Sequence, residues 1–280
     1  MKDRCFAKIN LCLDVAGKRS DGYHELKMVM VPIDFYDVLE MIPSNETKLE
    51  TNKVYLPVNE KNSIIKAFNI MKERYHLYDN FTFRLQKHIP TRAGLAGGSA
   101  DAASVIRMLD AYYGLGMNVQ EKIEVGKMVG SDVPFCLINK PAMVEGTGDI
   151  IMPFTCYLDF ELLLVKPKKG VSTKEAFELV DSQEPVHPDC NAVREGLILG
   201  DYQKVVNNLG NSLEAASLTL VEEIKEVKEK MIALGFDGVL MSGSGSTVFG
   251  ISQSSTFVNN AMKKLKKQEY FVRRTKILRG

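Results

Sequence analysis

Residues 89–105 carry the clearest chemical signal in the chain. Three glycines, Gly94, Gly97 and Gly98, lead into Ser99 and then into a run of small helix-forming residues. A flexible loop that runs directly into a helix offers free backbone N–H groups at the positive end of the helix dipole, and this arrangement binds phosphate. Ser99 is placed to cap the helix and to lie near a phosphate or its metal. The alternative is an ordinary glycine loop that caps a core helix.

Charged residues elsewhere in the chain supply the other groups that phosphoryl transfer needs. Lys8 and Asn10 are two residues apart in an alternating segment, so they project from the same face of a strand. A lysine there neutralises phosphate or holds an alkoxide, and the alternative is a solvated strand face. Asp132 lies among small and apolar neighbours, where a carboxylate can accept the proton of a hydroxyl. The alternative for Asp132 is a turn or helix-cap aspartate.

Two further segments have the residue types of a binding site. Tyr23 and His24 follow a turn and offer an aromatic shelf with a polar edge, which either holds a nucleobase or closes a hairpin. The run from Ser242 to Ser246 alternates serine with glycine between apolar segments. A glycine loop in that position indicates close backbone contact with another group.

The elements that must position these residues follow from periodicity. Residues 4–15 alternate with their apolar side chains on one face, which predicts a half-buried strand. Strands and helices interleave without strict alternation, which favours an α+β fold, and we place a domain boundary near Pro153. Further strands are expected at 26–33, 37–42, 81–85, 141–146, 159–165, 238–241, 247–250 and 270–277, and helices at 62–77, 99–113, 119–129, 173–180, 191–199, 201–209, 217–234 and 254–267.

Bulk composition excludes several classes of protein. The 280 residues carry a net charge of +1, so nothing indicates electrostatic binding of nucleic acid or a membrane surface. The longest dense apolar run, Leu162–Val165, is too short to span a bilayer, and the first residues do not form a signal peptide. Five scattered cysteines without zinc-ligand spacing predict reduced thiols in a cytoplasmic protein. These cysteines are Cys5, Cys12, Cys136, Cys156 and Cys190.

Taken together, the segments resemble the GHMP kinases over essentially the whole chain. The three motifs of that family occur in the family's order, at Ala7–Leu11, Pro90–Ala103 and Met241–Thr247. Within the family, the segments Arg19–Glu25 and Gly130–Phe135 resemble the corresponding segments of the kinases that act on a cytidine diphosphate conjugate of methylerythritol. Those kinases belong to the non-mevalonate route to isoprenoid precursors.

The resemblance implies an α+β fold of two domains, an ATP-binding domain at 1–152 and a second at 153–280, with the active site in the cleft between them. It implies transfer of phosphate from ATP to a hydroxyl of the methylerythritol moiety, with Mg²⁺ held mainly by phosphates and waters. Asp132 is then the general base, and Lys8 orients the hydroxyl. Ser246 stands where the family commonly has proline, which is expected to loosen its loop.

The same resemblance assigns the binding residues. Tyr23 and His24 would hold the cytosine, with Phe177 as a stacking partner on the other side. The substrate positions are Asn10, Tyr23, His24, Phe177, Ser242 and Gly243, and the ATP positions are Asn62, Pro90, Gly94, Leu95, Ala96, Gly97, Gly98 and Ser99.

Two alternatives stay open at this point. One is a different GHMP kinase that acts on a small alcohol or phosphoalcohol, which would leave the shelf of Tyr23 and His24 without a role. The other is a paralogue that binds nucleotide or cytidine ligands without catalysis, and the intact Lys8 and Asp132 argue against it.

Overall fold

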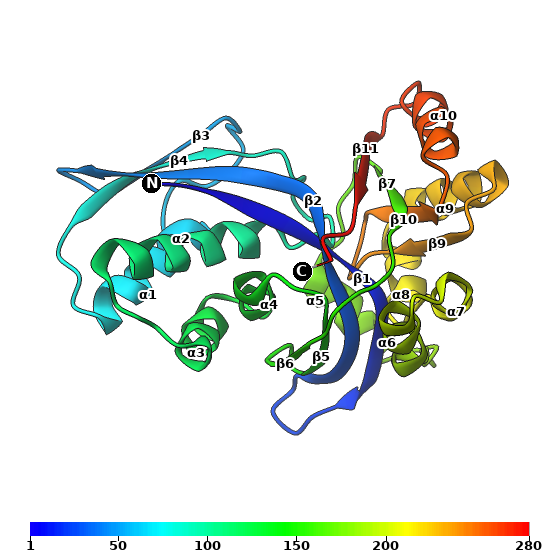
Figure 1. The fold of residues 1–280 in the computed structure, drawn as a ribbon, viewed down its shortest axis with the longest axis horizontal. Helices are drawn as coiled ribbons and strands as arrows, with labels where there is room; N and C mark the ends of the chain where they lie inside the picture. Colours follow the sequence, from blue (N-terminus) through cyan, green and yellow to red (C-terminus); the bar gives the residue numbers. More distant parts are fainter. Residues whose placement is uncertain (280) are drawn as a thin grey trace. The chain divides into compact units, whose positions relative to one another are not determined.

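A computed structural model describes residues 1–279, which form two compact units built from separate stretches of the chain. The first unit contains Met1–Ala7, Phe35–Pro90 and Ala96–Asn139, and the second contains Lys8–Asp34, Thr91–Leu95 and the chain from Lys140 onward. Two long strands, β1 (Lys2–Lys18) and β2 (His24–Ser44), supply residues to both units (Figure 1). The mixture of sheets and helices confirms the predicted α+β class.

The domain limits at 1–152 and 153–280 stay a prediction. Pro153, where we expected the boundary, lies within the second compact unit at the end of a strand.

The first unit is a sheet with helices on one side (Figure 1). Strand β4 (Asn80–Gln86) pairs antiparallel with the second half of β2 and parallel with β3 (Lys48–Thr51). The apolar face of α1 includes Phe68, whose ring lies edge-on to Phe81 and Phe83 of β4. The helices of this unit are α1 (Ser63–Arg74), α2 (Gly97–Tyr113), α3 (Val119–Val129) and α4 (Val133–Ile138).

The second unit contains two groups of strands. The first half of β2 pairs antiparallel with β5 (Ala142–Gly146), which pairs with β6 (Ile150–Pro153), and β1 pairs parallel with β8 (Gly210–Asn211). A separate antiparallel sheet has the order β11–β7–β10–β9. Its strands are β7 (Glu161–Lys166), β9 (Gly238–Met241), β10 (Val248–Ser252) and β11 (Phe271–Lys276).

Six helices complete the second unit. Helices α9 and α10 pack against the β11–β7–β10–β9 sheet, and α5 packs against α8. The six are α5 (Thr173–Val180), α6 (Cys190–Leu199), α7 (Tyr202–Asn208), α8 (Glu214–Leu220), α9 (Glu223–Leu234) and α10 (Ser255–Leu265). Within residues 1–279 we find no helix with the length and apolar character that crossing a bilayer requires.

Some predicted elements differ from the structure. The strands expected at 26–33 and 37–42 are one continuous strand, β2. The helix expected at 217–234 is two helices, because Val221 takes an extended conformation between α8 and α9. No helix was expected between 129 and 173, but residues 133–138 form α4, and its Pro134 stands in the first turn, where a helix tolerates proline.

Candidate active site

The polar face of β1 is buried, so the prediction of a half-buried strand is wrong. The exposed fraction of Lys8 is 4% and that of Asn10 is 0%. Lys8 Nζ donates a hydrogen bond to Asn10 Oδ1 (2.7 Å), and Asn10 Nδ2 donates to the sulfur of Met28 (3.4 Å). The alternative of a solvated strand face is thereby excluded, and the Lys8 ammonium is held at a defined position.

The two glycine loops reach β1 within the second unit. We call residues 90–99 the first glycine loop and residues 241–247 the second glycine loop. Ser242 Oγ accepts a hydrogen bond from the Asn10 backbone N–H (3.3 Å) and donates to the Gly94 carbonyl (2.9 Å). The Lys8 backbone N–H donates to the Leu95 carbonyl (3.2 Å). Three segments far apart in sequence therefore meet at the middle of β1, at Lys8 and Asn10.

Gly94 is the residue that permits this approach. Its φ of +70° lies in the left-handed region, and a Cβ built on it would lie 1.9 Å from the Ser242 carbonyl oxygen. No other residue fits at this position without moving the second glycine loop.

Side chains that the sequence analysis did not identify hold the second glycine loop. Asn211 Nδ2 donates to the carbonyls of Met241 (2.9 Å) and Gly243 (2.8 Å). Ser217 Oγ donates to the Ser244 carbonyl (3.0 Å). No local pattern marks Asn211 or Ser217, because the backbone that they bind lies at least 27 residues away in the chain.

Ser246 does not loosen this loop, contrary to expectation. Its side chain is fully buried, and its Oγ donates to the Lys169 carbonyl (2.6 Å). Lys166 Nζ donates to the carbonyls of Pro167 (2.9 Å) and Lys169 (3.3 Å), so it holds the turn that Ser246 contacts. Burial lowers the pKa of the Lys166 amine.

The residues of the expected base-binding shelf lie in the second unit. The His24 ring stacks on Phe177, with ring centroids 4.9 Å apart and an interplanar angle of 29°. His24 Nε2 lies 2.5 Å from a carboxylate oxygen of Asp181, and this contact, together with Lys18, holds the pKa of Asp181 below its usual value. Tyr23 is 67% exposed. Phe177 therefore stacks on the imidazole itself, and its place against a nucleobase stays a prediction.

The start of α2 in the first unit is the expected anion site. The helix begins at Gly97, and its N-cap residue Ala96 has a φ of +54° and makes no side-chain capping bond. Ser99 lies inside the first turn, so the prediction that it caps the helix is wrong. Ser63 Oγ donates to the Gly98 carbonyl (2.7 Å) and links the start of α1 to this turn. The N–H groups of the first turn are thus left uncapped by side chains.

Asn62 is the N-cap of α1, next to that turn. Its Oδ1 accepts from the Ile64 backbone N–H (3.0 Å), and its Nδ2 donates to the Pro57 carbonyl (2.8 Å). An open pocket of about 440 Å³ lies beside it, lined in part by Asn59 and Lys61. Contact of Asn62 with adenine stays a prediction.

Asp132 occupies the N-cap position of α4 but does not cap the helix. It is half-buried, and its carboxylate makes no capping hydrogen bond. Asp132 belongs to the first unit and Lys8 to the second. The joint action of these two residues therefore stays a prediction. Within residues 1–279, no group of three or more His, Cys, Asp or Glu side chains is arranged to hold a metal ion.

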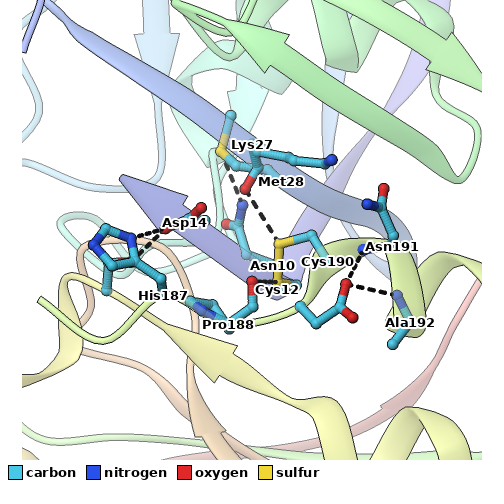
Figure 2. The surroundings of a disulfide bond; sticks show 12 residues. Asn10, Cys12, Asp14, Lys27, Met28, His187, Pro188, Cys190, Asn191 and Ala192 are labelled. Carbon is cyan, nitrogen blue, oxygen red and sulfur yellow. Dashed lines mark hydrogen bonds and ion pairs between the residues drawn. A yellow bond between two sulfur atoms is a disulfide. The ribbon is translucent and has the colours of Figure 1, made fainter. Parts of the chain in front are cut away.

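The prediction of reduced thiols is wrong for one pair of cysteines. Cys12 of β1 and Cys190 at the start of α6 form a disulfide, with Cα atoms 5.4 Å apart (Figure 2). Figure 2 shows Asn10 beside this bridge on the same strand. The two cysteines are 178 residues apart in sequence, so no spacing pattern indicates the bond. Cys5, Cys136 and Cys156 are buried and take no part in this disulfide.

Two protein families and individual relatives match this chain. The family described as GHMP kinases N terminal domain matches residues 62–140, and the one described as GHMP kinases C terminal matches residues 193–270. The 4-diphosphocytidyl-2-C-methyl-D-erythritol kinase of Clostridium beijerinckii is 39% identical over 279 residues, which covers 98% of this chain and 100% of the relative. The enzyme of the same name from Bacillus cytotoxicus is 39% identical and covers 95% of this chain and 94% of the relative.

Solved structures of GHMP kinases also match this chain. The crystal structure of a 4-(cytidine 5'-diphospho)-2C-methyl-D-erythritol kinase matches all of both chains, with a TM-score of 0.84 at 30% identity. Mevalonate kinase of L. major covers 100% of this chain and 96% of its own with a TM-score of 0.77, and at 17% identity it shows a shared fold alone. The chain belongs to the GHMP kinase family.

Proposed function

We propose that this protein is an ATP-dependent kinase that phosphorylates a hydroxyl of 4-diphosphocytidyl-2-C-methyl-D-erythritol. The observation that carries the proposal is the Ser242 hydroxyl, which joins β1 to the Gly94 carbonyl and so brings the three family motifs together. Relatives that bear the name of this kinase match the chain over nearly its full length.

The backbone at the start of α2 binds the phosphates of ATP. The N–H groups of Gly97, Gly98 and Ser99 are not occupied by a side-chain cap, and they stand at the positive end of a helix of 17 residues. Asn62 lies beside a pocket at the neighbouring helix start and contacts the adenine. When bound with the nucleotide, Mg²⁺ would supply positive charge to the phosphates and would be held mainly by phosphate and water oxygens.

Lys8 and Asp132 divide the remaining chemistry. Asp132 accepts the hydroxyl proton as the substrate oxygen bonds to the terminal phosphorus, and the bond to the leaving ADP breaks. Lys8, fixed by Asn10, orients the hydroxyl and stabilises the developing charge. Because this transfer needs little covalent chemistry from the protein, most of the acceleration comes from alignment and charge.

The cytidine end of the substrate selects among alcohols. Tyr23 offers an exposed ring for stacking, and His24 with Phe177 supplies the polar edge and a second aromatic surface. Ser242 and Gly243 complete the wall of the site. A kinase for mevalonate or homoserine has no use for these aromatic groups.

The experiment is a coupled assay of ADP release with the cytidine substrate, mevalonate and homoserine. We expect turnover of the cytidine substrate only, and we expect Asp132→Asn to lower kcat at least about a thousandfold while ADP still binds. Asp201→Asn is the matched control, because Asp201 is also a helix N-cap, and its activity should equal that of the wild type. Turnover of mevalonate or homoserine alone refutes the substrate. Absence of turnover with every alcohol, while ADP binds, favours the non-catalytic paralogue.

A further inference from the structure

Three buried charged side chains lie beneath the start of α2, and the proposed mechanism uses none of them. Lys87 Nζ is 2.6 Å from Asp37 Oδ2 and 2.5 Å from Asp101 Oδ2. The exposed fractions of the three side chains are between 0% and 4%. Burying ionised groups is unfavourable unless they are paired and hydrogen-bonded, so such a cluster calls for a role.

The Asp37 carboxylate fixes the backbone that leads into the first glycine loop. Its Oδ1 accepts hydrogen bonds from the backbone N–H groups of His88 (2.5 Å) and Ile89 (2.8 Å). Asn52 Oδ1 accepts from the Lys87 N–H (2.8 Å) and holds the preceding residue. Residues 87–89 therefore have a fixed backbone.

The other side of the cluster touches the helix that carries the anion site. Asp101 lies in α2, four residues after Gly97, and is bound by the Lys87 ammonium. A Cβ built on Gly97 would lie 2.8 Å from Ile89 Cγ2 and 3.0 Å from Lys87 Nζ. The residues that Asp37 fixes thus pack directly against the first residue of the helix.

The charge of the cluster suits a site for an anion. Burial raises the pKa of Asp101 to about 7 against the attraction of Lys87, and the Asp37 charge adds to the rise. Burial disfavours the Lys87 ammonium, but the two carboxylates outweigh this and raise its pKa. The nearby Cys5 thiol is kept neutral because burial raises its pKa. One ammonium cannot balance two buried carboxylates, and the raised pKa of Asp101 leaves that carboxyl partly protonated near pH 7, which reduces the negative charge that a phosphate would meet.

We propose that Asp37, Lys87 and Asp101 are positioning residues for nucleotide binding, which clamp the first glycine loop to α2 so that the N–H groups of the first turn are preorganised for phosphate. This inference rests on the proposed function and names three residues that support its ATP site. The clamp acts on ATP and not on the cytidine substrate, because all of its contacts are with residues that lead into or start α2.

The test compares Asp37→Ala with Asp37→Asn. Either change leaves Lys87 paired with Asp101, whereas a change of Lys87 leaves two buried carboxylates without a cation. Asparagine keeps an oxygen acceptor for the two N–H groups, and alanine does not. Asp110 provides the matched control, because it binds Lys122 (2.7 Å) and the Met117 N–H (3.0 Å) at the other end of α2.

We expect Asp37→Ala to weaken ADP binding, measured by calorimetry, by about tenfold or more, and to raise KM for ATP equally, with KM for the cytidine substrate within about twofold of wild type. Asp37→Asn should weaken ADP binding by about threefold. Asp110→Ala and Asp110→Asn should lower Tm and leave ADP binding unchanged.

A folded Asp37→Ala protein that binds ADP within about twofold of wild type overturns the inference, and so do equal losses in the Asp37 and Asp110 variants. If Asp37→Ala fails to fold, the inference is tested with Asp37→Asn instead. An ADP affinity of Asp37→Asn equal to that of Asp110→Asn then overturns the inference. If the wild-type protein binds no ADP, the proposed function is overturned as well. If the wild-type protein binds ADP and the Asp37 variants bind it equally well, only the inference about the clamp is overturned.

Discussion

Replacement of Gly94 by alanine tests whether the two glycine loops must touch. The added Cβ would stand 1.9 Å from the Ser242 carbonyl oxygen, whereas ordinary contacts begin at 3.4 Å, so one of the loops must move by 3.4 − 1.9 = 1.5 Å. The Ser242 hydroxyl also bonds Asn10 and the Gly94 carbonyl, so this movement breaks the link between β1 and both loops.

The size of the effect follows from two separate contributions. A left-handed φ in alanine is unfavourable by about 1 kcal/mol, which lowers Tm by about 3 °C in a chain of this size. Displacement of site groups by about 1 Å can lower the rate about a hundredfold. We therefore expect kcat/KM for Gly94→Ala to fall at least about a hundredfold, with a fall in Tm larger than the backbone term alone.

Gly200→Ala separates the two contributions. Gly200 has a φ of +74°, close to that of Gly94, and a Cβ built on it meets nothing within 4 Å. This variant should show the fall in Tm with kcat/KM unchanged in the coupled assay. If Gly94→Ala and Gly200→Ala have the same kcat/KM, the contact between the loops has no part in catalysis.

Two further variants test the electrostatics and the specificity of the protein. Because burial raises the pKa of Asp101 to about 7, the folded protein holds a proton that the unfolded chain releases near pH 4, so the free energy of unfolding falls as the pH rises from about 4 to about 7. Asp101→Asn should remove this decrease, which amounts to at most about 4 kcal/mol between about pH 4 and about pH 7. The free energy of unfolding is measured by urea denaturation at each pH, and the same pH dependence in the variant and the wild type would contradict the assignment. Tyr23→Ala should weaken binding of the cytidine substrate about tenfold or more, through loss of stacking, with ADP affinity unchanged. Equal losses for both ligands would refute the role of the Tyr23 ring.

Elements with local signals were predicted well. Helices α3 and α5 begin and end at the expected residues, because their boundaries are set by side chains next to them in sequence. Asn118 caps α3 in a capping box with Glu121, and Ser172 caps α5. In contrast, α4 comes soon after Gly130 and has Pro134 in its first turn, and both residue types usually end helices. Strand β3 has only four residues. Patterns of this kind carry too little local information to predict the element.

The site was predictable to the extent that its residues form contiguous motifs. The β1 motif and both glycine loops were identified from the sequence, and the structure joins them through Ser242 and Gly94. The supports were not identified: Asn211 holds the second glycine loop, and Asp37 holds the backbone that leads into the first. Each is a single polar residue in an ordinary strand or loop, and its partner becomes known only when the chain has folded.

The error made for β1 shows where this limit lies. Alternation correctly placed Lys8, Asn10 and Cys12 on one face, but it cannot tell whether that face meets water or protein. The residues that contact this face are Ser242 and Cys190, which lie more than 170 residues later in the chain. A lysine and an asparagine can be buried there because they bond to each other, and this mutual satisfaction keeps a positive charge out of bulk water. A cation in such surroundings acts on a substrate oxygen more strongly than one on an open strand face, which is the physical basis for assigning Lys8 to catalysis.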